Sequence, residues 1–234
     1  MMAPRHVLIT GASRGIGKAL AEHCLAAGDC VVGCGRTPSA LSHERYLHCT
    51  VDVTDGAAAS GLFRDLRKRF RTLDVLINNA GVAGMNAIAL TPLDAARRMV
   101  ETNFLAPFNF TREALRLMRG SAAARIVNVS TVAVPMRLEG EAVYAASKSA
   151  LETFTRIAAR EFAPFGITCN AVGPCPIRTK LTAGVPDAKI QALIDRQAVR
   201  RWAVPADVVN VVEFFLRPES SMITGQVVYL GGAG

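Results

Sequence analysis

The chain has 234 residues, of which 50% are hydrophobic and 20% are charged, so it can bury a substantial core and suits one large domain better than two. No apolar run reaches the ~18 residues that a membrane span needs, and the first residues lack a signal-peptide core. We therefore expect a cytoplasmic protein with no membrane partner. The net charge of +8 comes from basic residues that are mostly mixed with acidic ones, and aromatic residues make up only 6%. This pattern favours solvated helix faces and an attraction for phosphorylated ligands, and we expect no nucleic-acid partner.

Cysteine usage gives no sign of a metal site. The six cysteines lack a paired C-x-x-C spacing, and most lie in apolar stretches. We expect reduced, packed thiols and no metal cofactor.

Apolar runs and helical patterns alternate along the whole chain. Strands are expected over residues 6–10, 30–35, 46–51, 73–78, 125–130, 167–172 and 226–230. Helices are expected over residues 15–27, 57–70, 92–119, 142–162 and 206–216. Nearly continuous Val, Ile and Leu runs are typical of parallel strands that are covered on both faces. The order predicts a single α/β domain over residues 1–234, a Rossmann-type doubly wound parallel sheet of about seven strands with helices on both faces. Residues 178–204 are charged and irregular, and we expect them to form a mobile substrate lid.

A glycine-rich turn follows the first expected strand and opens the first helix. Gly11 and Gly15 allow a tight backbone turn, and Gly17 removes a side chain where the helix meets the strand. A pyrophosphate can rest on the N–H groups of such a helix start. We therefore expect a dinucleotide to bind at Gly11, Ala12, Ser13, Arg14, Gly15, Ile16 and Gly17.

The end of the second strand favours NADP(H) over NAD(H). Folds of this class read the 2′ group of the cofactor there, and a carboxylate at that place would bind the ribose diol of NAD. The chain has Gly35 followed by Arg36, and the glycine turn adds Arg14. Guanidinium groups bind a 2′-phosphate well. The alternative is that Arg36 merely begins a solvated loop.

Polar residues also follow the third and fourth strands, whose ends face the ligand crevice. Asp52, next to Val53, could accept a hydrogen bond from the adenine amine, and Asn79 with Ala80 and Gly81 would let the ribose approach. Each could instead belong to an ordinary turn.

Tyr144 and Lys148 lie four residues apart, which places a phenol and an ammonium on one helix face. A phenol with a pKa near 10 is a poor acid or base at neutral pH. A nearby ammonium favours the phenolate, so we expect the pKa of Tyr144 to move towards the working range.

These motifs together resemble the short-chain dehydrogenase/reductase family over essentially the whole chain. The resemblance rests on T-G-A-S-R-G-I-G at 10–17, Asp52-Val53, N-N-A-G at 78–81, Asn103, a hydroxyl before Tyr144, and Y-A-A-S-K at 144–148. It implies that Tyr144 is the general acid/base and that Lys148 lowers its pKa and holds the nicotinamide ribose. It also implies that Asn103 holds a water of a proton relay, and that Ile177 and Thr179 contact the nicotinamide carboxamide.

The hydroxyl that polarises the substrate carbonyl is a serine in most of that family, thirteen residues before the tyrosine. Here that position is Thr131, which keeps the donor but adds a methyl group. We expect Thr131 to act, with Ser130 bonded to backbone. If the loop has a one-residue insertion, Ser130 takes the role.

Within the family the chain looks most like the 3-oxoacyl-acyl-carrier-protein reductases of fatty-acid biosynthesis, which implies NADPH-dependent reduction of a 3-oxoacyl thioester. Acyl carrier protein is a possible partner, although the docking charges of those enzymes are not clearly reproduced at Phe165 and at 121–124. A dehydrogenase of a sugar, polyol or other secondary alcohol is the alternative, and a non-catalytic NADP(H)-binding regulator is another. The resemblance further implies a homo-oligomer, a tetramer or a dimer, that pairs the helices at 92–119 and 142–163.

Overall fold

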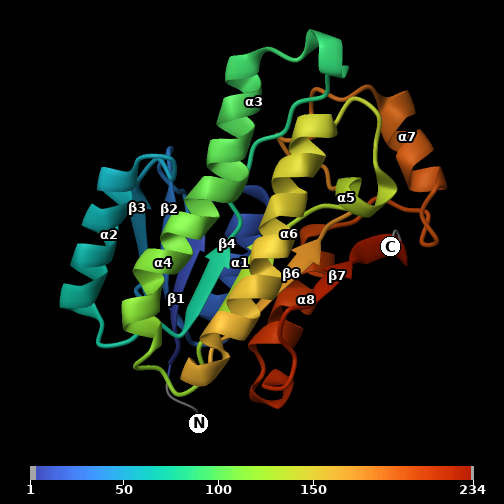
Figure 1. Ribbon diagram of the computed structural model, residues 1–234. Helices are drawn as coiled ribbons and strands as arrows, with labels where there is room; N and C mark the ends of the chain where they lie inside the picture. The colour runs from blue at the N-terminus through green and yellow to red at the C-terminus, as the bar shows by residue number, and fades with distance from the viewer. Residues whose placement is uncertain (1–3, 233–234) are drawn as a thin grey trace.

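A computed structural model describes residues 4–232, and its centre is one parallel sheet of seven strands in the order β3-β2-β1-β4-β5-β6-β7 (Figure 1). The strands are β1 His6–Thr10, β2 Cys30–Gly35, β3 Tyr46–Thr50, β4 Val75–Asn78, β5 Arg125–Val129, β6 Thr168–Gly173 and β7 Val227–Tyr229. The helices are α1 Gly15–Ala26, α2 Gly56–Arg69, α3 Leu93–Val100, α4 Ala106–Met118, α5 Ala133–Met136, α6 Ala142–Phe162, α7 Asp187–Asp195 and α8 Pro205–Leu216. The expected Rossmann-type single domain is confirmed.

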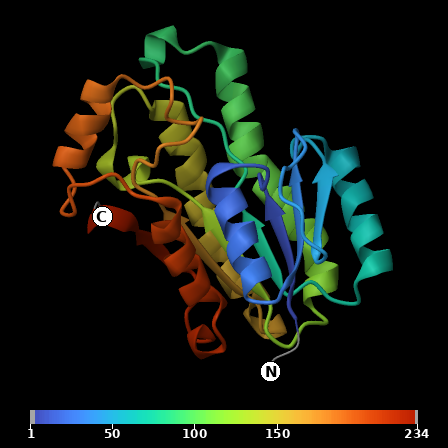
Figure 2. The ribbon, with the colours of Figure 1, turned by 180° about the vertical axis from the view of Figure 1, so that it is seen from behind.

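Helices cover both faces of the sheet, as the apolar strand runs predict. Figure 1 shows α4 and α6 in front of the sheet, and Figure 2 shows α1 and α8 over the opposite face. Along β1, Leu8 packs into the core on the α2–α4–α6 side, whereas Val7 and Ile9 pack on the α1–α8 side. No helix of residues 4–232 is both long and apolar enough to cross a membrane.

The strand order reverses between β1 and β4, which lie side by side at the middle of the sheet. In open parallel sheets the crevice beyond the carboxyl ends of such strands is where ligands bind. The glycine turn after β1 and the Asn79–Gly81 loop after β4 therefore meet at this crevice, although 69 residues separate Thr10 from Asn79 in the chain.

Two expectations about helices need correction. The single helix predicted over 92–119 is divided into α3 and α4 by a π-helical turn over Glu101–Leu105. Pro107 accounts for the interruption, because it has no N–H to continue the α-helical hydrogen bonds. The 178–204 segment, expected to be irregular, contains helix α7, whose buried Ile190 and Ile194 anchor it to the domain.

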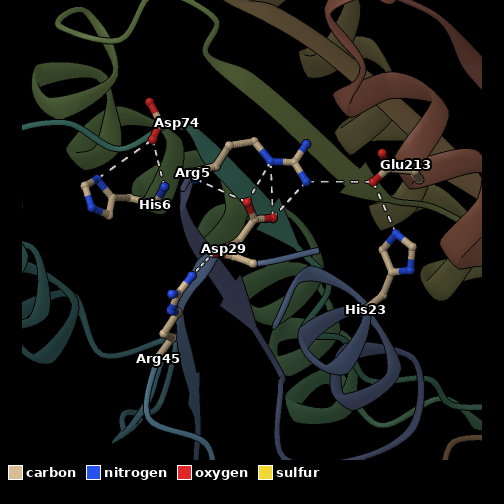
Figure 3. A network of polar contacts seen from close by, with 8 residues as sticks. Arg5, His6, His23, Asp29, Arg45, Asp74 and Glu213 are labelled. Atoms are coloured by element: carbon tan, nitrogen blue, oxygen red, sulfur yellow. Dashed lines mark hydrogen bonds and ion pairs between the residues drawn. The ribbon is translucent and has the colours of Figure 1, made fainter. Parts of the chain in front are cut away.

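A polar network ties the amino ends of the strands together, on the side of the sheet opposite the crevice (Figure 3). Arg5 binds the buried Asp29 carboxylate with two nitrogens, Nε at 3.1 Å from Oδ1 and Nη2 at 2.8 Å from Oδ2. Glu213 of α8 lies 3.9 Å from Arg5 Nη2 and 3.2 Å from His23 Nε2. The network thus connects the chain before β1, the α1–β2 loop and α8.

We expect Asp29→Asn to lower the free energy of unfolding by about 1.5 to 3 kcal/mol, because it leaves the bidentate guanidinium without its charged acceptor. The urea midpoint of unfolding measures this effect. Asp65→Asn is the matched control, since Asp65 pairs with Lys68 at 3.4 Å on an exposed surface of α2 and such pairs contribute little. Equal midpoints for the two variants would contradict the expectation.

Candidate active site

A single cleft of about 1630 Å³ lies at the carboxyl ends of the strands, and its walls come from the loops after β1 to β6 and from α6 and α7. Most of the residues expected from the sequence line it: Gly11, Ser13, Arg14, Gly15, Ile16, Arg36, Asp52, Val53, Asn79, Ala80, Gly81, Ser130, Thr131, Tyr144, Lys148, Ile177 and Thr179. Ala12, Gly17 and Asn103 are buried and do not line the cleft. The cleft is larger than a single small-molecule pocket, so it has space for a dinucleotide and a substrate together.

The glycine turn is shaped for close backbone approach. Gly11 and Gly15 have φ angles of +69° and +56°, a region that favours glycine. A Cβ added to Gly17 would lie 2.2 Å from the Gly11 carbonyl oxygen, so only glycine fits there. No side chain of the described residues caps the start of α1 at Arg14, and the first N–H groups of the helix remain available to a ligand. These features fit the pyrophosphate of a dinucleotide.

Thr10 and Asn79 hold this turn in place. The Thr10 hydroxyl accepts hydrogen bonds from the N–H groups of Asn79 and Ala80, both at 3.0 Å. The Asn79 amide donates to the carbonyls of Thr10 at 2.9 Å and Gly11 at 3.2 Å. The Asn79 side chain is thus engaged in bracing the turn, while its residue still lines the cleft.

The ends of β2 and β3 present opposite charges to the cleft. Arg14 and Arg36 are exposed on its wall. The Asp52 carboxylate accepts from Thr54 N at 3.0 Å and Thr54 Oγ1 at 2.8 Å. The Thr54 N–H is the main cause that lowers the pKa of Asp52, with a smaller contribution from Arg36.

Asn103 sits in the π-helical turn and links two walls of the site. It is fully buried, and its side chain bonds both the N–H and the carbonyl of Val82 at 2.9 Å and the Ser147 hydroxyl at 3.0 Å. Pro107 lacks the N–H that an α-helix would donate to the Asn103 carbonyl, so that carbonyl makes no α-helical hydrogen bond. The geometry thus suits the water-holding role that the family resemblance implies for Asn103.

Tyr144 and Lys148 lie one turn apart on α6, and both are buried. Lys148 Nζ donates to the Val129 carbonyl at 2.6 Å, which fixes the ammonium against the end of β5. Burial lowers the pKa of Lys148 to about 8, and Glu152 acts in the opposite direction.

The expected shift of the tyrosine is wrong in sign. Burial raises the pKa of Tyr144 to about 12, the Thr131 hydroxyl partly offsets this, and the Glu141 carboxylate adds to it. The loss of water around the phenol is the dominant cause, and the effect of the Lys148 ammonium that the spacing predicted is not among the causes of the shift. Tyr144 and Lys148 therefore both carry their protons at pH 7.

The two neighbouring hydroxyls after β5 have different partners. Ser130 Oγ donates to Glu152 Oε1 at 2.5 Å, so the expectation that Ser130 bonds backbone is wrong. Thr131 Oγ1 accepts from Ala133 N at 3.2 Å and lies beside the Tyr144 phenol. A hydroxyl that accepts in this way keeps its own proton for donation.

The residues after β6 close the cleft over the glycine turn. A Cβ added at Gly15 would come within 3.5 Å of the Thr179 methyl group, so Thr179 lies directly above the turn. Ile177 is buried and forms a bridge with Ala203.

Sequence reasoning missed Glu152 and the substrate side of the cleft. Glu152 follows Lys148 by one turn and belongs to the buried stripe Tyr144, Ser147, Lys148, Leu151, Glu152 and Thr155. The helical periodicity of this stripe was a usable signal. The cleft wall also includes Met85, Leu138, Glu141, Ile190 and Arg196, which come from loops and α7. These residues belong to no sequence motif that would have indicated them.

Comparison with known proteins identifies the family. A family model described as enoyl-(acyl carrier protein) reductase matches residues 11–232. The 3-oxoacyl-acyl-carrier-protein reductase FabG of Salmonella typhimurium is 32% identical over 231 residues, 96% of this chain and 95% of the relative. Ligand-free aldohexose dehydrogenase of Thermoplasma acidophilum is 28% identical, with a TM-score of 0.89 over 98% of this chain and 94% of that one. A 4-hydroxyisoleucine dehydrogenase complexed with NADH is also 28% identical, with a TM-score of 0.90 over 97% of each chain. The chain thus belongs to the short-chain dehydrogenase/reductase family of oxidoreductases, which act on carbonyl and alcohol groups.

Proposed function

We propose that the protein reduces a carbonyl to a secondary alcohol with NADPH, and that its substrate is a 3-oxoacyl thioester. The observation that carries the proposal is the placement of the buried Tyr144 phenol beside the Thr131 hydroxyl and one turn from Lys148. A proton donor is what a newly formed alkoxide needs. NADPH, when bound, supplies the hydride.

The other steps of the proposed reaction are assigned to four side chains of the site. Thr131 donates a hydrogen bond to the substrate oxygen and stabilises the negative charge that develops on it. Tyr144 transfers its proton to the same oxygen. The Lys148 ammonium, held by the Val129 carbonyl, stabilises the phenolate that remains. Asn103 supports a water through which Lys148 and Tyr144 regain the proton.

The preference for NADP(H) over NAD(H) is supported by charge. Arg14 and Arg36 line the cleft at the place where the 2′ group lies in this class of fold. Gly35 occupies the end of β2 in place of a carboxylate, and Asp52 is engaged by Thr54. The guanidinium groups suit a 2′-phosphate.

The thioester substrate is supported by the relatives named as 3-oxoacyl reductases and by the apolar side chains Met85, Leu138 and Ile190 of the cleft. Docking of an acyl carrier protein has weaker support. Phe165 and the uncharged loop 121–124 lack the docking charges expected of that group. The Arg119 guanidinium lies 3.8 Å from the centre of the Phe165 ring. A coenzyme A thioester is the substrate form that requires no such docking.

Oxidation or reduction of a sugar is the second candidate. The aldohexose dehydrogenase of similar fold supports it, as does the Glu141 carboxylate, which lines the cleft near Tyr144 and could accept a hydrogen bond from a substrate hydroxyl.

Two further features belong to the proposal. Residues 178–204 are proposed to act as the substrate lid, and α7 makes up much of this segment. We also propose a homo-oligomer that pairs α4 and α6, where Phe108 and Ile157 are exposed together with Leu105 of the preceding π-helical turn.

We expect Tyr144→Phe to lower kcat by about 10²- to 10⁴-fold, because it removes the proton donor. The assay follows NADPH oxidation at 340 nm with an acetoacetyl thioester, set beside simple ketones and aldohexoses. Tyr46→Phe is the control, since Tyr46 bonds His48 outside the cleft. Full activity of Tyr144→Phe would refute the mechanism, and NADPH binding without turnover of any substrate would favour a regulator.

We expect Thr131→Ala to lower kcat by roughly 100-fold or more, as removal of one donor to an oxyanion does. Thr131→Ser should keep most of the activity, because it retains the hydroxyl. Ser130→Ala should cause a smaller loss, and the reverse order of the two alanine variants would assign the role to Ser130. Steady-state kinetics with the best substrate of the panel decide between them.

We expect Arg36→Asp to lower the preference for NADPH over NADH by about tenfold or more, since it exchanges a phosphate ligand for a repelling charge. The ratio of the two dissociation constants, measured by fluorescence titration, reports this preference. Arg64→Asp makes the same change of charge on the exposed face of α2 and should leave the ratio unchanged. A wild-type ratio near one would overturn the cofactor assignment itself.

A further inference from the structure

Glu152 is a buried carboxylate directly behind the reacting centre. It lies one turn after Lys148 on α6, and only 3% of its surface is exposed. Burying a carboxylate is costly unless hydrogen bonds and charge partners compensate for the lost water. Glu152 lies one turn from Lys148 and two turns from Tyr144 on α6. A carboxylate buried at this free-energy cost is expected to have a role beyond the packing of the helix.

The hydrogen bonds of Glu152 reach the residue before Thr131 and a residue of β7. Oε1 accepts from the Ser130 hydroxyl at 2.5 Å, and Oε2 accepts from the Tyr229 hydroxyl at 2.6 Å. Ser130 directly precedes Thr131 in the chain. The Tyr229 ring packs against Gly173, where an added Cβ would lie 2.4 Å from Tyr229 Cδ1 and 3.3 Å from the Thr131 carbonyl carbon. One carboxylate therefore holds Ser130, in the loop after β5, and Tyr229 of β7, whose ring packs on Gly173 close to the Thr131 backbone.

The charge of Glu152 also acts on Lys148. Lys148 and Glu152 lie one turn apart within the same buried stripe of α6, so their side chains are neighbours without forming a direct ion pair within 4 Å among the described residues. Glu152 is the charged group that raises the pKa of Lys148 against the lowering by burial. The other titratable groups nearby are Tyr144 on α6, Tyr229 on β7, and Arg156, whose Nη2 lies 3.9 Å from Glu152 Oε2. On the side of the sheet, β5 presents the Val129 carbonyl to Lys148.

We propose that Glu152 is a positioning residue of the reductase centre, which clamps the Ser130 and Tyr229 hydroxyls around Thr131 and serves as the counter-charge of the Lys148 ammonium. This inference rests on the proposed function for its kinetic readout only. Its two parts are separable, because the clamp depends on the length of the side chain and the counter-charge depends on its ionisation.

The charge part is tested by NMR on protein labelled with [ε-¹³C]lysine, without substrate or cofactor. The chain has five lysines, and Lys148→Met assigns the signal of Lys148. Loss of the negative charge removes the group that raises the pKa of Lys148, so in Glu152→Gln the signal should titrate at lower pH, by about 0.5 unit or more. Glu161→Gln, on the exposed end of the same helix, should leave the titration unchanged. An unshifted Lys148 in Glu152→Gln would overturn the counter-charge role.

The kinetic test uses the pH profile of kcat/KM. Lys148 must be charged, so the rate falls as pH rises through its pKa, and Glu152→Gln should move this alkaline limb to lower pH. If Glu152→Gln lowers kcat/KM equally at every pH and the alkaline fall stays at the wild-type pH, Glu152 has a structural role only. If the wild-type enzyme turns over no substrate while the lysine signal still shifts, the proposed function fails and the counter-charge role stands.

Glu152→Asp tests the clamp and also covers the case in which Glu152→Gln does not fold. Aspartate keeps the negative charge on a side chain that is one methylene shorter. The pKa of Lys148 should therefore stay within about 0.3 unit of the wild-type value. The hydrogen bonds to Ser130 and Tyr229 should lengthen, and kcat should fall about tenfold with an unmoved alkaline limb. Wild-type kcat in Glu152→Asp would refute the clamp.

Discussion

The proposed reacting centre depends on one constraint, the burial of ionisable groups along a single face of α6. Tyr144, Lys148 and Glu152 occupy successive turns, each shielded from water by the sheet edge and the surrounding loops. Burial favours the neutral forms of Tyr144 and Lys148, and the Glu152 carboxylate one turn from Lys148 opposes this effect on the lysine. The charge of the lysine is therefore set together by its burial and by a side chain on the next turn. The same face also packs on β5 and β6, which makes fold stability and chemistry share one interface.

Hydrogen bonds between loops turn this helix face into a rigid site. Asn103 connects the loop after β4 to Ser147, and Ser147 in turn donates to the Tyr144 carbonyl at 2.7 Å. Thr10 and Asn79 connect the same loop to the glycine turn. The nucleotide half and the reacting half of the cleft are therefore parts of one network across the strand switch point. Pre-organisation of this kind is what places reacting groups without a rearrangement during the reaction.

The sequence predicted the fold and the position of the glycine turn well because both are encoded locally. Continuous apolar strands, glycine spacing and the Tyr144–Lys148 interval each carry a short-range physical signal. The failures have long-range causes. The π-helical turn depends on Pro107 within a strong helical pattern, and helix α7 is visible only once Ile190 and Ile194 find a surface to cover. The sign of the Tyr144 shift depends on how completely the folded chain removes water from the phenol, which no spacing reveals. The Ser130 hydroxyl donates to a carboxylate 22 residues away in the chain and not to a local backbone carbonyl.

The short strand β7 has a consequence for how the protein becomes active. It pairs with β6 only through Ala171↔Val227, Val172↔Val228 and Gly173↔Tyr229, yet its last residue supplies the Tyr229 hydroxyl to Glu152. That hydrogen bond joins residues 77 positions apart, so it cannot form before the chain has been synthesised as far as Tyr229. The hydrogen bonds between Thr10 and Asn79 that hold the glycine turn need only the first part of the chain. During translation the contacts of the glycine turn can therefore form before the contacts of Glu152 are complete.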